Sequence, residues 1–254
     1  MRDNFFFIIG AQRSGTTYLL QILDEHPEVF MARPVKPEPK FFLDESKYQQ
    51  GIGHYLDLHF SKHANEKLFG EKSTSYLECH EIGPRIIDFF PEAKVVVILR
   101  NPVNRALSNY FFSKEHGLEI RSLSEVFLKN APAPTVNISL SVSPFNYLER
   151  GDYVKHLHPY NEVFKDRMLV LIHDQFVTKQ DEIAGLYRFL SIDDRFIPQS
   201  INKVINMIGA DFKSSQVDEE IFEFLQDHYL DPIERLEEYL KIDLIKWKQP
   251  VTKN

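Results

Sequence analysis

Short apolar runs recur along the chain and predict the strands of one sheet. They lie at residues 5–9, 94–99 and 168–172 and consist almost entirely of apolar side chains, and a further short strand that leads into a turn is expected at 68–73. The runs at 94–99 and 168–172 are nearly continuous, which is typical of strands buried on both faces of a parallel sheet.

Between these runs, apolar residues recur at helical spacing, and several helical stretches end at or near a proline. We expect the last of these helices to be interrupted at Pro232. The alternation of strands and helices predicts a three-layer α/β/α fold with a mainly parallel central sheet, formed as a single domain over residues 1–254. The predicted helices cover residues 16–26, 48–60, 81–90, 102–111, 151–164, 180–190 and 217–240.

Two proline-rich stretches interrupt this alternation. The segment 31–42 contains Pro34, Pro37 and Pro39, which predicts an extended, irregular chain that displays its polar residues. The segment 117–144 is the least regular part of the sequence and could form a lid or a substrate loop.

The stretch after the first strand has the form of a phosphate-binding loop. Gly10 and Gly15 bound a turn that follows the run 5–9 and precedes the predicted helix from Thr16. Inward-pointing N–H groups and the positive end of a helix would bind an anion there. However, Thr16 stands where an ATP-binding loop has lysine, and Arg100 stands where the metal-binding aspartate would follow the third strand. We therefore expect a phosphate-like group that is handled without a metal.

Composition narrows the class of protein. The 254 residues include 30 basic and 37 acidic side chains, for a net charge of −7, which argues against nucleic-acid binding through phosphate neutralisation. The single cysteine, Cys79, excludes an internal disulfide and a cysteine-rich metal site. No apolar run approaches the length of a membrane span, and the loop begins close to Met1, so we expect a cytoplasmic protein without membrane contact.

Two motifs together resemble the sulfotransferases that use 3′-phosphoadenosine 5′-phosphosulfate (PAPS) and release the bisphosphate PAP. The resemblance extends from Phe5 to about Trp247. In that family a loop of the form Q-[KR]-[ST]-G-T-T cradles the 5′-phosphosulfate, and a strand ending in Arg, followed eight residues later by Ser, holds the 3′-phosphate. The matching residues here are Gln12, Arg13, Ser14, Gly15, Thr16 and Thr17 for the first motif, and Arg100 and Ser108 for the second. Arg105, between the last two, is interpreted as structural.

The resemblance also suggests catalytic residues. Glu38, in the segment Pro-Glu-Pro-Lys-Phe-Phe, matches the glutamate that deprotonates the acceptor in glycan sulfotransferases, although a solvated loop carboxylate is the alternative. Lys72 matches a lysine that lies beside the acceptor in glycan sulfotransferases, and the alternative is a surface lysine at the end of a strand. Lys40 is a weaker candidate for a role in the same pocket. Arg13 would stabilise charge on the departing phosphate oxygen but is too weak an acid to protonate it.

Other expected features of the family are weaker here. The cytosolic branch uses a histidine base, but no histidine occupies a matching position, and His54, His116 and His173 are interpreted as surface or structural residues. Arg150-Gly151-Asp152-Tyr153 resembles the family's R-G-x-Y segment. The late loop that closes the nucleotide site has only Lys213 as a basic residue.

The predicted activity is sulfuryl transfer from PAPS to a hydroxyl or amine of an acceptor, with no metal. The acceptor is expected to be a saccharide, and a lipid or small metabolite is the alternative. Two other functions stay open: a nucleotide kinase with a degenerate loop, which the missing lysine and aspartate disfavour, and a nucleotide-binding protein that has lost turnover. The sequence does not predict the oligomeric state.

Overall fold

The computed structural model describes residues 4–135, 142–202 and 217–249 of the chain. The chain packs as two compact units, each considered by itself below. The first contains Met1–Arg100 and Leu157–Met207, and the second contains Asn101–His156 and Ile208–Asn254. The expectation of a single domain stays a prediction.

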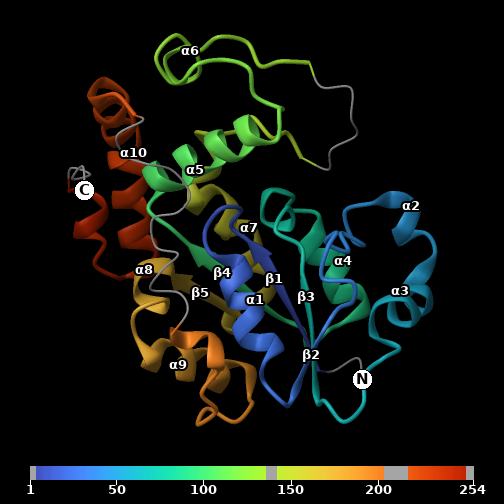
Figure 1. The fold of residues 1–254 in the computed structure, drawn as a ribbon. Coiled ribbons are helices and arrows are strands. Elements are labelled where there is room, and N and C mark those ends of the chain that lie inside the picture. The colour runs from blue at the N-terminus through green and yellow to red at the C-terminus, as the bar shows by residue number, and fades with distance from the viewer. Residues whose placement is uncertain (1–3, 136–141, 203–216, 250–254) are drawn as a thin grey trace. The chain divides into compact units, whose positions relative to one another are not determined.

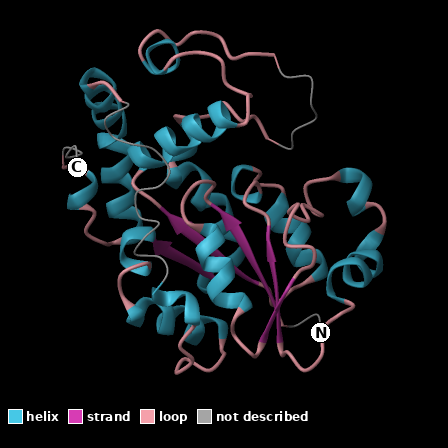
Figure 2. Ribbon diagram, in the orientation of Figure 1, coloured by secondary structure: helices cyan, strands magenta, loops and turns pink. Residues whose placement is uncertain are grey.

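The first unit is built on a parallel sheet of five strands in the order β2-β3-β1-β4-β5 (Figures 1 and 2). Each neighbouring pair is parallel, so all carboxyl ends meet at one edge of the sheet. This confirms the predicted parallel sheet. The strands are β1 (Phe5–Gly10), β2 (Val29–Met31), β3 (Leu68–Lys72), β4 (Lys94–Leu99) and β5 (Met168–Ile172).

Alternate residues of β1 point into two separate cores, as the pleat of a strand requires. Phe6 and Ile8 belong to a cluster with residues of α1 (Thr16–Asp24) and α9 (Gln180–Leu190). Phe7 faces the other way, and its ring lies 5.6 Å from that of Phe42 between centroids. Helices therefore cover both faces of the sheet (Figure 1), which confirms the three-layer fold.

The remaining helices of the first unit are short. They are α2 (Glu45–Tyr48), α3 (Gly51–Phe60), α4 (Ile82–Phe89), α8 (His173–Phe176) and the part of α7 (Tyr153–Phe164) that follows His156. Gly83 of α4 packs against Tyr160 and Phe164 of α7.

The second unit is helical and encloses several charged side chains. It contains α5 (Pro102–Glu115), α6 (Leu123–Phe127) and α10 (Glu219–Leu240). Arg105 is fully buried and donates to the Tyr147 carbonyl and the Asn109 side chain, which agrees with its structural interpretation. Arg150, of the R-G-x-Y segment, also donates to Asn109, at 2.8 Å. These donors hold the irregular chain around Tyr147 in place.

Several predicted boundaries were wrong, and several short elements were missed. The predicted helix 48–60 corresponds to α3, which begins only at Gly51, where the backbone is left-handed (φ 79°). Helix α1 ends two residues early, and α10 continues through Pro232, since Tyr229, Ile233 and Leu236 keep one buried stripe across it. The missed elements include β2, α2, α6 and α8. Part of the predicted lid segment around α6, residues 136–141, lies outside the described residues.

Candidate functional site

The phosphate-binding loop begins where β1 ends and α1 begins, as predicted. A Cβ atom on Gly10 would lie 2.8 Å from Leu77, so the close approach of that side chain requires glycine. Arg13 and Gly15 both have left-handed backbones, with φ of 64° and 92°. These two residues bend the loop so that it curls around the amino end of α1.

The amino end of α1 has polar groups that form no hydrogen bond with the described residues. Gly15 is the N-cap of α1, it provides no side-chain hydrogen bond, and no acidic residue lies in the first turn. The Ser14 hydroxyl is fully buried and has no hydrogen-bond partner among the described residues. Leaving a buried hydroxyl unpaired is costly, and the first N–H groups of a helix attract anions. The loop therefore fits the phosphate group that the sequence predicts.

Arg100 lies beside the same loop. It follows β4 directly, and its Nη1 atom donates to the Arg13 carbonyl at 3.4 Å. The structure thus brings together two of the predicted cofactor residues, because the carboxyl ends of β1 and β4 are neighbours. Ser108 is buried on α5 in the second unit, so its pairing with Arg100 stays a prediction. Lys213 lies outside the described residues.

Glu38 and Lys72 form an ion pair. Lys72 Nζ lies 2.6 Å from Glu38 Oε1, with the two side chains only 8% and 17% exposed. Thr74 donates its backbone N–H to Glu38 Oε2 at 3.1 Å, and its hydroxyl lies 3.2 Å from both carboxylate oxygens. The two predicted catalytic residues are therefore neighbours. The expectation that segment 31–42 displays all its polar residues was wrong for Glu38.

The segment around Glu38 is held by its neighbours. Phe41 and Phe42 are buried, and the Phe42 N–H donates to the Tyr76 hydroxyl at 3.2 Å. The Lys40 N–H donates to Ser73 Oγ at 2.9 Å, which ties the segment to the end of β3. Burial of two aromatic rings on one side fixes the position of the carboxylate on the other.

The ion pair and the loop meet along one short stretch of chain. Gln12, in the loop, donates its side-chain amide to Ser75 Oγ at 3.3 Å and to Glu78 Oε1 at 3.1 Å. Ser75 follows Thr74, the residue that hydrogen-bonds Glu38. The anion loop and the candidate base thus lie at the adjacent carboxyl ends of β1 and β3, where open parallel sheets bind their ligands.

A second carboxyl group lies beneath this site. Glu71 is fully buried, and the Tyr55 hydroxyl donates to its Oε2 atom at 2.5 Å. Burial raises the pKa of Glu71, despite hydrogen bonds from hydroxyl groups that act in the opposite direction. Burial also raises the pKa of Tyr55 well above its ordinary value. Glu71 is therefore a buried carboxyl group, next to Lys72 in β3, that favours its protonated form.

His173, which we interpreted from the sequence as a surface or structural residue, lies next to the loop. His173 follows β5 directly, and an added Cβ on Gly15 would lie 2.6 Å from its Cδ2 atom. The side chain is only 12% exposed, whereas His54 and His116 are exposed. Arg100 and His173 directly follow β4 and β5, which are parallel neighbours. The argument that places Arg100 at the carboxyl edge of the sheet therefore places His173 there as well.

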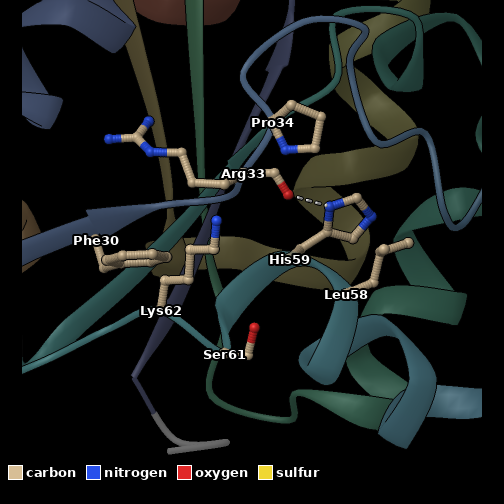
Figure 3. Close-up of a pocket in the computed structure, with 7 residues that line it drawn as sticks. All are labelled: Phe30, Arg33, Pro34, Leu58, His59, Ser61 and Lys62. Carbon is tan, nitrogen blue, oxygen red and sulfur yellow. Dashed lines mark hydrogen bonds between the residues drawn. The ribbon is translucent and has the colours of Figure 1, made fainter.

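A separate cavity of about 480 Å³ lies beside the edge strand β2 (Figure 3), and none of the predicted site residues lines it. Its wall contains Phe30, Arg33, Pro34, Leu58, His59, Ser61 and Lys62. In the described part of the chain, no cluster of three or more His, Cys, Asp or Glu residues could hold a metal ion, and no helix is long and apolar enough to cross a membrane. The metal-free reaction and the cytoplasmic location stay predictions.

Comparison with known proteins shows the family to which this chain belongs. The family model of the sulfotransferase domain matches residues 3–229. The chain therefore belongs to the sulfotransferase domain family, which confirms the resemblance drawn from the two motifs.

Two of the similar proteins have names that refer to sulfotransferases acting on heparan sulfate. Heparan sulfate glucosamine 3-O-sulfotransferase 3B1 of Mus musculus is 33% identical over 187 residues, which is 73% of this chain and 45% of the relative. The human bifunctional heparan sulfate N-deacetylase/N-sulfotransferase 2 is 28% identical over 74% of this chain and 22% of its own length. This chain thus spans less than half the length of either relative.

Solved structures are also similar over most of the chain. The crystal structure of a sulfotransferase from Alicyclobacillus acidocaldarius matches with a TM-score of 0.76 and 25% identity, covering 96% of this chain and 98% of that one.

Proposed function

We propose that this protein transfers a sulfuryl group from PAPS to a hydroxyl or amine of a saccharide. Membership of the sulfotransferase domain family supports the reaction type. The names of two relatives, which refer to O- and N-sulfation of heparan sulfate, support a saccharide acceptor. A lipid or small-metabolite acceptor is the alternative.

The loop and its cations would bind the donor. The backbone N–H groups of residues 13–17 and the buried Ser14 hydroxyl would hold the 5′-phosphosulfate. Arg13 would neutralise charge on the phosphate oxygen that departs, and Arg100 would bind the 3′-phosphate with charge-assisted hydrogen bonds. Ser108 and Lys213 are further proposed ligands of the nucleotide.

Glu38 would act as the general base. The acceptor oxygen or nitrogen attacks sulfur and loses its proton to the Glu38 carboxylate. The bond between sulfur and the phosphate oxygen breaks, and its electron pair leaves with that oxygen, so that PAP and the sulfated acceptor are formed. Lys72 and Arg13 would stabilise the negative charge that spreads over the transferred group.

The observation that carries the proposal is the Glu38–Lys72 pair, 2.6 Å apart, beside an anion-binding loop. Thr74 and Lys72 fix the carboxylate, and each carboxylate oxygen can accept further hydrogen bonds from an acceptor group. General-base catalysis needs a carboxylate in a fixed position that can accept the proton of the acceptor group.

Replacement of Glu38 by Gln tests the proposal. We expect Glu38→Gln to lower turnover with PAPS and a heparan-type oligosaccharide by about 10²- to 10⁴-fold, while calorimetry shows nearly unchanged PAP affinity. The matched control is Glu28→Gln, because Glu28 forms a similar ion pair with Lys67, 2.5 Å apart, at the opposite end of β2 and β3.

The outcomes separate the alternatives. Full activity in Glu38→Gln would remove Glu38 from the mechanism. PAP binding by the unmodified protein without turnover on saccharides, lipids or small hydroxylated metabolites would favour a nucleotide-binding protein that has lost catalysis. Absence of PAP binding would contradict the proposed donor.

A further inference from the structure

His173 forms part of the wall of the phosphate-binding loop. Its ring edge, made of Cδ2 and Nε2, faces Gly15: an added Cβ on that glycine would lie 2.6 Å and 3.1 Å from these two atoms. Because the side chain is mostly buried, the ring has a fixed position beside the amino end of α1.

The hydrogen bonding of the ring leaves one nitrogen open. Nδ1 lies 3.0 Å from Asp174 Oδ1. A carboxylate only accepts hydrogen bonds, so Nδ1 carries the proton of this bond. Nε2, on the edge that faces the loop, has no hydrogen-bond partner within the described residues. Asp174 thus orients the ring, and Nε2 is available to a ligand.

The sheet order places His173 on a defined side of the loop. Glu38 and Lys72 lie at the end of β3, on one side of β1, whereas Arg100 and His173 follow β4 and β5 on the other side. If Glu38 is the base of the proposed function, the sulfuryl group must point toward β3. The nucleoside half of the donor then extends toward β4 and β5.

On this basis, which rests on the proposed function, we propose that His173 binds the ribose of the donor nucleotide through a hydrogen bond between Nε2 and the 2′-hydroxyl. The 2′-hydroxyl is the only free ribose hydroxyl in a 3′,5′-bisphosphate. Nε2 lies against Gly15, next to the N–H groups that would hold the 5′-phosphate, and the ribose is the part of a nucleoside nearest to that phosphate. A hydroxyl can donate and accept, so this contact does not depend on the charge of the imidazole.

A binding cycle with two ligands tests the contact. The affinities of PAP and 2′-deoxy-PAP are measured by calorimetry for the unmodified protein, His173→Phe and His173→Gln. We expect removal of the 2′-hydroxyl to weaken binding to the unmodified protein about tenfold. His173→Phe, which keeps a ring but has no nitrogen, should bind both ligands equally.

His173→Gln provides the control for a purely structural role, because its amide can still hydrogen-bond a hydroxyl. We expect it to recover part of the preference for PAP, which a packing effect alone would not produce. A preference for PAP that persists undiminished in His173→Phe would overturn this inference and leave the proposed function intact. Failure of the unmodified protein to bind either nucleotide would overturn both.

Discussion

At the scale of single residues, the Glu38–Lys72 pair couples function to stability. Both side chains are largely withdrawn from water, so removal of one partner leaves the other charge poorly solvated. Thr74 compensates Glu38 only in part, because its two donors are uncharged. The two residues should therefore behave as one unit rather than as independent contributors.

A double-mutant cycle measures this coupling. We expect Lys72→Met and Glu38→Gln each to lower the free energy of unfolding, and the double variant to lose about 1–3 kcal/mol less than the sum of the two losses. Urea unfolding of the four proteins at neutral pH gives the values. Additive losses would show that the pair contributes no net interaction.

Glu71 gives a pH-dependent prediction. Its pKa is raised above the ordinary value near 4.5, so the folded protein keeps a proton that the unfolded chain has lost. The stabilising contribution of the protonated carboxyl is complete below pH 4.5 and is lost as the pH rises toward the folded pKa. Glu71→Gln cannot titrate but can still accept the hydrogen bond from Tyr55.

We therefore expect the unfolding free energy of Glu71→Gln to rise relative to that of the unmodified protein as the pH increases from 4.5 to 7. Urea unfolding at steps of pH provides the comparison. A difference between the two proteins that stays constant with pH would mean that Glu71 titrates alike in the folded and unfolded states.

At the scale of elements, α3 contains a pair of glycines with opposite roles. Around both Gly51 and Gly53, a Cβ atom would meet nothing within 4 Å, but only Gly51 has a positive φ, of 79°. Gly51 is the first residue of α3, and Gly53 lies inside the helix. Backbone conformation is therefore the main difference between the two sites.

We expect Gly53→Ala to stabilise the protein by about 0.5–1 kcal/mol and Gly51→Ala to destabilise it by about 1 kcal/mol. Chemical denaturation of both variants checks the signs. Equal effects of the two substitutions would indicate that the left-handed turn before α3 does not limit stability.

The elements differ in how far the sequence predicts them. The runs 5–9 and 94–99 carried strong signals because parallel strands buried on both faces are apolar throughout. The run 168–172 is also apolar, although β5 is an edge strand and three of its residues are half-buried. β2 has only three residues, too few for a periodic pattern. α6 could have been found, since Ser122 and Glu125 form a capping box. The start of α3 at Gly51, in contrast, has a positive φ angle that the sequence does not state.

The residues of the candidate site also differ in how far the sequence predicts them. The loop residues and Arg100 were predictable because a motif and a strand end marked each of them. The Glu38–Lys72 contact joins residues 34 positions apart, and its geometry comes from the burial of Phe41 and Phe42, which is a tertiary effect. A lone histidine has no motif, so the sequence favoured a surface or structural interpretation of His173, although its position after β5 places it at the same edge of the sheet.

At the scale of the whole molecule, the sequence did not predict the division into two compact units. Hydrophobic periodicity reports local structure, and it gives no information on which helices share a core. The family model covers residues 3–229 and so includes parts of both units. The sulfotransferase domain therefore corresponds to more than the sheet and the helices that cover it.

The whole-molecule prediction concerns donor binding in a chain with a net charge of −7. A ligand that binds only the folded state raises its stability by about 2.7 kcal/mol at a concentration of 100 times Kd. For a chain of this length, that corresponds to an increase in Tm of about 5–10 °C. We expect PAP to produce such a shift in the presence of a metal chelator, and ADP to produce a smaller one, because ADP lacks the 3′-phosphate proposed for Arg100.

Scanning calorimetry at fixed nucleotide concentrations measures the shift, with Arg100→Ala as the matched variant. This substitution should reduce the effect of PAP to that of ADP, and raising the salt concentration should weaken the PAP effect, since the attraction is between charges. Equal shifts for PAP and ADP would show that the 3′-phosphate is not recognised. A shift that disappears with the chelator would show that a metal takes part in binding, because the protein alone would then be unable to hold the bisphosphate.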